Sequence, residues 1–326
     1  MKKSCVVVCL TVIFSATACS APQETRRREP RVRTLPFEAP PSALPKLAHC
    51  ESVELPPLPS QVVFPEARQR SEEAVTEALQ RYHEGALAQA LALTREAVEA
   101  DPYAFRAHMT AGVVSAGLKN PGQALLHFCQ ARRLDESSRK ALYWIGYCYL
   151  EMQRHEQGIR AMRELTRIDP ENARAWYELG FALLRQEEHE AALAALERCL
   201  ALNADNAPAL YERGFALYRL GRHEAAAGSY QRAAKLRPTH VDTWKELAET
   251  AFLVDDLKTA RRAARRVVRL DPKAPEGPLW LGRVLVKRGR CRKGLAELDK
   301  AFELAPAEER TRYEKIREES GTLCHE

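Results

Sequence analysis

The chain has 326 residues, of which 45% are hydrophobic, and its formal net charge at pH 7 is +6. This composition is sufficient for a folded domain, and the charge is modest for the length. No run of 18 or more apolar residues follows the N-terminus, so the sequence predicts no membrane-spanning helix in the body of the chain.

Residues 1–18 have the pattern of a secretory signal peptide. Two lysines follow Met1, an apolar stretch runs from Cys5 to Phe14, and the small residues Ala16, Thr17 and Ala18 form a cleavage region. The apolar stretch is too short to span a membrane. We therefore expect the protein to be exported.

The cleavage region ends directly before Cys19 and resembles the lipobox of bacterial lipoproteins, with Ala16 in place of the usual Leu. The resemblance implies that Cys19 becomes the acylated N-terminus. Ser20 then favours sorting to the outer membrane, with the mature protein facing the periplasm of a Gram-negative bacterium. The alternative is an ordinary signal peptide that is cut nearby, with Cys19 incidental.

Residues 19–65 read as a lipidated N-terminus followed by a disordered linker rich in proline and arginine. Ten of the nineteen prolines lie between Pro22 and Pro65, and no helical period occurs there. Such a segment favours extended polyproline conformations and acts as a semi-rigid spacer. The arginines between positions 26 and 33 either contact an anionic membrane surface or are simply solvated.

A 34-residue period organises the rest of the chain. Within residues 173–206, Gly180 lies on a predicted first helix and Ala192 on a predicted second helix. Glycine inside a helix is unfavourable, so we expect Gly180 to permit close approach of the second helix, with Ala192 facing it. The glycine recurs as Gly112, Gly146, Gly214 and Gly282, and Ala78 and Ala248 fill the other two positions.

These repeats resemble the tetratricopeptide repeat family. The motif W-x-x-L-G spans Trp176 to Gly180, and W-x-x-L-A spans Trp244 to Ala248. The resemblance implies an all-α protein, a right-handed α-solenoid of helix-turn-helix units, with residues 309–326 as a C-terminal cap. Within residues 66–308 the seven repeats are 71–104, 105–138, 139–172, 173–206, 207–240, 241–274 and 275–308.

In this family one stripe of the first helices lines a concave groove that holds segments of partner proteins. Here the stripe carries aromatic residues in repeats three to five, framed by basic residues. Rings edged by arginine are typical of binding hot spots, so we expect a partner segment with acidic and apolar side chains. The alternative is that the rings pack on one another across repeats and are only half exposed. The candidate groove residues are Tyr143, Tyr147, Tyr177, Phe181, Tyr211, Phe215, Tyr218, Lys140, Arg174, Arg185, Arg219 and Lys245.

Export to an oxidising compartment makes disulfides possible. In an antiparallel stack the end of the cap lies near the start of the last second helix, which predicts a bond between Cys291 and Cys324. Cys129 and Cys148 fall on neighbouring helices and form a weaker candidate pair. Cys199 lies in a small, buried column and is expected in the core.

The sequence does not favour an enzyme, a cofactor or a metal site. His155, His189 and His223 occupy equivalent repeat positions, too far apart to share a zinc ion. Phosphate-binding loops and hydrolase motifs are absent. We expect a non-enzymatic scaffold that binds a protein partner, in layout similar to lipoproteins that assist the assembly of pili or secretins. The alternative is an accessory subunit or glycan binder for peptidoglycan-processing enzymes. Neither nucleic acid nor a small-molecule substrate is expected.

Overall fold

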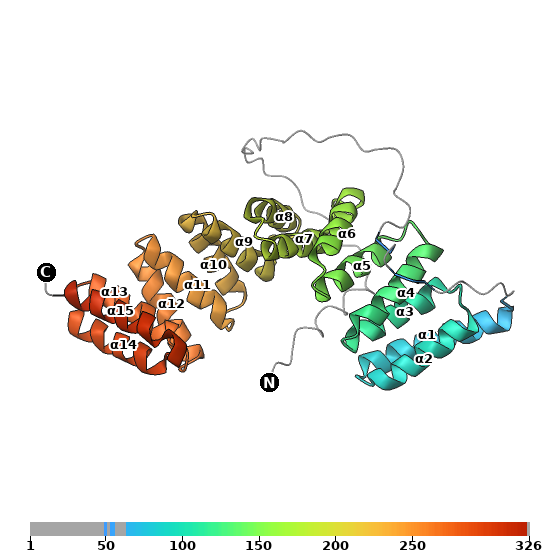
Figure 1. Ribbon diagram of the computed structural model, residues 1–326, viewed down its shortest axis with the longest axis horizontal. Coiled ribbons are helices and arrows are strands. Elements are labelled where there is room, and N and C mark those ends of the chain that lie inside the picture. Colours follow the sequence, from blue (N-terminus) through green and yellow to red (C-terminus); the bar gives the residue numbers. More distant parts are fainter. Residues whose placement is uncertain (1–48, 51–52, 56–62, 325–326) are drawn as a thin grey trace, which may run out of the picture. The chain divides into compact units, whose positions relative to one another are not determined.

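The computed structural model describes residues 49–50, 53–55 and 63–324, and every regular element among them is a helix (Figure 1). The chain divides into two compact units, residues 1–136 and residues 137–326. The predicted signal peptide, Cys19 and the linker arginines lie outside the described residues. No helix in the described ranges is both long enough and apolar enough to cross a bilayer.

The first unit contains two helix pairs. Helices α1 (Pro65–His83) and α2 (Leu87–Ala100) form the first, and α3 (Phe105–Gly117) and α4 (Pro121–Leu134) form the second. Helix α3 packs against both members of the first pair. Helix α1 begins at Pro65, before residue 71, where the first repeat is predicted to start.

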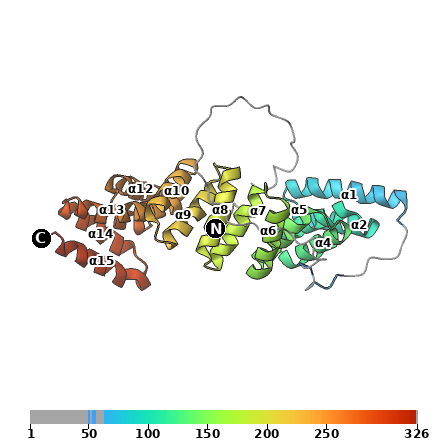
Figure 2. The same cartoon turned by 90° about the horizontal axis from the view of Figure 1, so that it is seen from above.

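The second unit continues with five helix pairs and a final helix, each packed against the next (Figure 2). Together with the first unit this gives seven pairs, so the prediction of an all-α fold of seven helix-turn-helix units with a capping helix is confirmed. The pairs are α5 (Arg139–Glu151) with α6 (His155–Ile168), α7 (Ala173–Arg185) with α8 (His189–Leu202), α9 (Ala207–Arg219) with α10 (His223–Leu236), α11 (Val241–Leu253) with α12 (Leu257–Leu270), and α13 (Glu276–Lys287) with α14 (Cys291–Leu304); α15 (Arg310–Thr322) is the cap.

A steric constraint at the crossing of α7 and α8 explains Gly180. A Cβ atom there would lie 2.7 Å from Cγ of Leu196 and 3.3 Å from the carbonyl oxygen of Ala192. The prediction that Ala192 faces the glycine is therefore incomplete, because the side chain that needs the space belongs to Leu196. Glycine here offsets a loss of helix propensity by admitting a large buried side chain.

The same pairing runs through the array. Where the first helix has glycine, a large side chain from the second helix fills the space. Where the first helix has alanine, at Ala78 and Ala248, the corresponding second-helix residues are the smaller Thr94 and Ala264. Volume is thus exchanged across the crossing, with a large second-helix residue opposite glycine and a smaller one opposite alanine. The large residues opposite glycine are Phe128, Met162, Leu196, Tyr230 and Leu298.

Each repeat turns between its helices through one residue in the left-handed backbone region. Glycine occupies this position in three repeats, whereas Lys119, Gln153, Glu187 and Asp255 adopt it with φ of 60–63°. In the second unit, the side chains of Ser138, Asn172 and Asn206 accept a backbone N–H bond at the start of α5, α7 and α9. These caps define where the first helices begin.

Two disulfides occur among the described residues. Cys291 at the start of α14 bonds to Cys324 after α15, with Cα atoms 5.7 Å apart, and this is the pair that the sequence favoured. Cys129 of α4 bonds instead to Cys50, with Cα atoms 5.8 Å apart, so the candidate pair of Cys129 with Cys148 is wrong. Sequence spacing missed Cys50 because no helical period relates it to α4.

Cys148 and Cys199 are buried free thiols. Burial raises the pKa of Cys148 to about 12 and that of Cys199 to about 11, because the thiolate loses its hydration. Both thiols are therefore unreactive in the folded protein. The position of Cys199 agrees with its expected place in the core.

We expect Gly180→Ala to destabilise the protein by about 1–3 kcal/mol, because the added methyl group overpacks against Leu196. Combined with Leu196→Ala, the same change should cost less than the sum of the single variants, because the methyl group added at residue 180 occupies part of the space that the shortened residue 196 leaves. Urea unfolding of both single variants and the double variant measures this coupling. Strictly additive free energies would contradict the steric account. Ala248→Gly is a control in which nothing is overpacked; it should lose about 1–2 kcal/mol, because it lowers helix propensity and removes a buried methyl group.

Non-reducing peptide mapping of oxidised protein should recover Cys50 linked to Cys129 and Cys291 linked to Cys324. Cys148 and Cys199 should be alkylated only after denaturation. We expect Cys324→Ser to destabilise the C-terminal end by roughly 2–4 kcal/mol, because it removes a cross-link between residues 33 apart. Alkylation of Cys291 in the native, unreduced protein would contradict the second pairing.

Candidate protein-binding face

The first helices of the last five repeats, α5, α7, α9, α11 and α13, share one face of the second unit, here called the first-helix face. Side-chain hydrogen bonds join several of them directly. Tyr143 donates to Glu178 Oε1 at 3.1 Å, from α5 to α7. Tyr218 of α9 donates to a carboxylate oxygen of α11 at 2.7 Å, and Lys245 donates to Oε1 of Glu276, from α11 to α13, at 3.2 Å. Successive repeats thus contribute to one continuous surface.

Six of the seven predicted aromatic residues lie on this face with their rings half-buried. Tyr177 and Phe181 stack with ring centroids 6.3 Å apart, because residues four apart meet on one side of a helix. These two rings stack on each other within one helix and not across repeats, although they are half-exposed, as the alternative expected. The half-buried rings are Tyr147, Tyr177, Phe181, Tyr211, Phe215 and Tyr218.

Tyr143 is a correction to the sequence analysis, because it is not an exposed ring of the face. It is 7% exposed, and its hydroxyl is bonded to Glu178. Burial raises the pKa of Tyr143 well above its ordinary value, and the neighbouring Glu178 carboxylate adds to this. Tyr143 supports Tyr147, whose ring stacks on it at 6.4 Å, and does not offer contact area of its own.

Three of the predicted basic residues lie over aromatic rings. The guanidinium carbon of Arg174 is 4.7 Å from the Tyr143 centroid, and that of Arg185 is 5.0 Å from the centroid of Phe181. Arg219 lies 5.7 Å from the Phe215 ring and 3.8 Å from a carboxylate oxygen of the α7–α8 turn. These are cation–π distances. The arginines and the rings therefore form mixed stacks.

The two predicted lysines differ. Lys140 at the start of α5 is exposed. Lys245 is half-buried, with its ammonium group 3.2 Å from Glu276 and 3.8 Å from Asp242. Lys245 thus neutralises acidic side chains of the protein itself and is not a free basic group at the edge of the face.

Sequence reasoning missed a row of glutamates at one repeat position, here called the carboxylate row: Glu178 on α7, Glu212 on α9 and Glu246 on α11. The spacing of 34 residues was a signal that could have found them. Burial raises the pKa of Glu178, and the hydrogen bond from Tyr143 opposes that rise. Burial raises the pKa of Glu212 to about 7, with Arg185 opposing.

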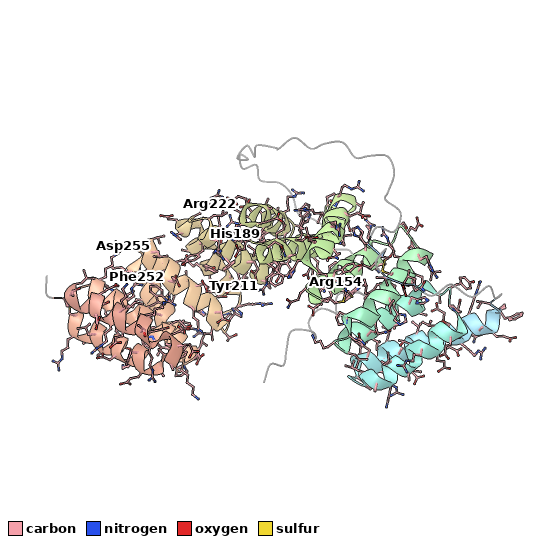
Figure 3. All side chains as sticks on the ribbon, viewed as in Figure 1. Arg154, His189, Tyr211, Arg222, Phe252 and Asp255 are labelled. Carbon is pink, nitrogen blue, oxygen red and sulfur yellow. A yellow bond between two sulfur atoms is a disulfide. The ribbon has the colours of Figure 1, made fainter. Side chains whose placement is uncertain are left out.

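Glu246 lies in the most acidic part of the face. Burial is the first cause that raises its pKa to about 7, followed by the negative charges of Glu249, Asp242 and Glu276. Lys245 opposes the rise, but its ammonium group is already engaged with Glu276. Figure 3 labels Tyr211, in the first half of α9, and Arg222, in the turn between α9 and α10.

A pocket of about 360 Å³ opens between the end of α5 and the middle of α7. One wall carries Phe181 with Arg185 stacked on it, and the other carries Glu151 and His155. Its mixture of a ring, a cation and an acid suits an amphipathic side chain. The remaining lining residues are Leu150, Gln153 and Ala182.

The face continues beyond the predicted residues into the last two repeats. Arg283 lies 4.5 Å from the Phe252 ring and 4.8 Å from the Trp280 ring. Burial lowers the pKa of Arg283, because the guanidinium loses hydration. The sequence analysis missed this stack although Phe252 lies one repeat after Tyr218 at the same repeat position, because Arg283 takes the position that carries a ring in Phe181 and Phe215.

The three equivalent histidines begin the second helices α6, α8 and α10. Within the described ranges, the Nδ1 atom of each is buried without a hydrogen-bond partner. The ring of His223 lies 5.3 Å from that of Tyr218, which is a packing contact. Among described residues no group of three or more His, Cys, Asp or Glu side chains could hold a metal ion.

Helix hairpins of constant length, stacked through repeated small-to-large crossings, define a helical-repeat protein. Two models described as tetratricopeptide repeat match the chain, one over residues 149–207 and the other over residues 181–249. The chain is a tetratricopeptide-repeat protein. No curated protein sequence matches it.

Solved structures share the fold. One, described under the functional characterization of Pseudomonas aeruginosa pilF, has a TM-score of 0.58 and 22% identity, and the match covers 65% of this chain and 96% of that one. A tetratricopeptide repeat protein from Parabacteroides merdae has a TM-score of 0.54 and 14% identity, with 79% of this chain and 100% of that one covered. At these identities the likeness concerns the fold.

We expect Glu246→Gln to stabilise the protein at pH 8.5 by roughly 1–3 kcal/mol and to have a smaller effect at pH 5. Below the ordinary pKa of 4.5 both states are protonated. Between 4.5 and about 7 the folded state keeps a proton that the unfolded state has lost, so stability falls as the pH rises. Urea unfolding at both pH values measures the difference. An equal effect at both would contradict the raised pKa, and exposed Glu190→Gln is the control.

Proposed function

We propose that this protein is a non-enzymatic scaffold whose first-helix face binds a segment of a partner protein. The observation that carries the proposal is the run of half-buried rings in three successive repeats, with Arg185 over Phe181 and Arg219 over Phe215. Aromatic and arginine side chains are enriched in binding hot spots, where they combine large apolar area with hydrogen-bond donors. The pocket beside Phe181 offers a place for an anchoring side chain of the partner.

The proposal includes export and anchoring. The N-terminal pattern favours an outer-membrane lipoprotein acylated at Cys19 and facing the periplasm. The two disulfides support an oxidising compartment, because such bonds are rare in reducing cytosol. Neither observation depends on the binding face.

Assembly of an envelope complex of the pilus or secretin type is the role that fits an anchored binding scaffold. An accessory subunit or glycan binder for peptidoglycan-processing enzymes is the other candidate, because exposed rings also stack on sugars. Crosslinking and pull-down from solubilised envelope separate the two. Recovery of pilus or secretin subunits supports the first role, and recovery of cell-wall enzymes or glycan fragments supports the second.

Phe181→Ala combined with Phe215→Ala should weaken partner binding at least about tenfold, because it removes two ring faces and the arginine stacks on them. The helical circular-dichroism signal should be unchanged, since both rings are half-buried. The matched control is Leu202→Ala with Leu236→Ala, which removes apolar side chains 40% and 41% exposed on second helices. Wild-type affinity of the phenylalanine double variant for the captured partner would show that the face is not the binding site.

A further inference from the structure

We propose that two members of the carboxylate row, Glu212 and Glu246, receive lysine or arginine side chains of an extended partner segment, so that the bound segment is basic. This inference rests on the proposed function and specifies the chemistry of the partner. It differs from the expectation from sequence, in which five basic residues around the rings favoured an acidic partner.

Most of the predicted basic residues of the face already interact with other groups of the protein. Arg174 and Arg185 lie over the rings of Tyr143 and Phe181, and Lys245 is paired with Glu276 and Asp242. These cations already interact with groups of the protein. An acidic partner would have to compete with those contacts, so the basic residues count for less than their number in the sequence implies.

Two acids of the carboxylate row have no ion-pair partner. Neither the Glu212 carboxylate nor the Glu246 carboxylate takes part in an ion pair or hydrogen bond with any described residue, although both side chains are half-buried. A buried carboxylate without a cation is unfavourable in its charged form. The face therefore lacks a positive charge at two successive repeats, and a cation from outside supplies it.

An independent observation lies at the same place. The side chain of Tyr230 on α10 is fully buried, and its hydroxyl has no hydrogen-bond partner within the described ranges. The ring crosses Gly214 and meets Tyr211 edge-on at 5.6 Å, and among the charges near its hydroxyl Glu246 has the largest effect. The Tyr230 hydroxyl is thus a buried polar group without a partner within the electrostatic range of Glu246 and Glu212, as expected for a site that lacks its ligand.

The spacing of the row sets the spacing of the partner's charges. The hydrogen bond from Tyr218 to Glu249 joins α9 to α11, and packed helices lie roughly 8–10 Å apart. A segment in the polyproline II conformation advances about 3.1 Å per residue with three residues per turn, so every third side chain lies on the same side. Cationic side chains at every third residue of the partner therefore align with successive glutamates.

Basic and acidic partner segments differ in whether their binding releases protons or takes them up. Both acids have a pKa of about 7, so each is partly protonated at neutral pH. A bound cation favours the ionised form and releases protons, whereas an acidic ligand takes protons up. The titratable and charged groups that interact electrostatically with Glu246 are Asp242, Lys245 and Glu249 on α11, Glu276 on α13, Tyr211 on α9 and Tyr230 on α10. Those that interact with Glu212 are Arg185 and Tyr177 on α7, Tyr211 on α9 and Tyr230 on α10.

The test uses the full chain and three fluorescent peptides of about twelve residues in one alanine and leucine host. The first has lysine at every third position, the second has glutamate there, and the third has the same lysines side by side. Fluorescence anisotropy should show the tightest binding for the spaced lysine peptide, with affinity rising from pH 6 to pH 8. Calorimetry in two buffers of different ionisation enthalpy should show proton release at pH 7.

Glu212→Gln combined with Glu246→Gln should weaken binding of the spaced lysine peptide by about tenfold or more and reduce its pH dependence. The matched control, Glu190→Gln with Glu224→Gln, makes the same change in net charge at exposed positions on α8 and α10 and should alter affinity less than about twofold. Unchanged binding by the first pair, or no binding of the lysine peptide at all, would overturn the inference.

Tighter binding of the glutamate peptide would also overturn it. If Phe181→Ala with Phe215→Ala abolished that binding, the face would still be the binding site and only the charge of the partner would be wrong. If that phenylalanine variant bound every peptide and the captured partner as wild type does, the proposed function itself would fail.

Discussion

Close packing at one crossing in each hairpin is the constraint on which the stack depends. Gly180 admits Leu196 between α7 and α8, and the equivalent glycines admit equally large residues, while Ala248 meets the small Ala264. Since volume is exchanged across the crossing, each hairpin keeps the same geometry. The regular stack then brings equivalent first-helix residues of successive repeats onto one face.

That regularity gives the face its chemistry. Residues one repeat apart lie on adjacent first helices, so a residue type that recurs at one repeat position forms a row of rings, arginines or carboxylates along the face. The arginines lie over the rings, as Arg185 does over Phe181, while Glu212 and Glu246 are half-buried and form no ion pair. The face thus combines apolar area that is already organised with a negative charge that is not yet balanced, which is the basis for a selective interaction with a partner segment.

The ends of the array are fixed differently from its middle. Hairpins inside the second unit, such as α7 with α8, pack against neighbours on both sides, whereas the cap α15 packs only on the last pair, and Cys291–Cys324 ties it there. Cys50–Cys129 ties the residues that precede the first hairpin to α4. Terminal repeats of a linear array lose half of their interfaces, so covalent bonds are most useful at these positions.

The sequence by itself determined the period, the helix pairs, the cap and the stripe of rings, because a 34-residue repeat of small and apolar positions leaves few other ways to bury those residues. It also indicated Cys291 with Cys324. Only the tertiary structure decided that Tyr143 is buried, that Lys245 is paired with Glu276, that Cys129 bonds to Cys50, and that Glu212 and Glu246 lack a cation. The physical reason is that burial and charge pairing depend on side chains from neighbouring repeats, and a period along one chain does not specify which of them meet.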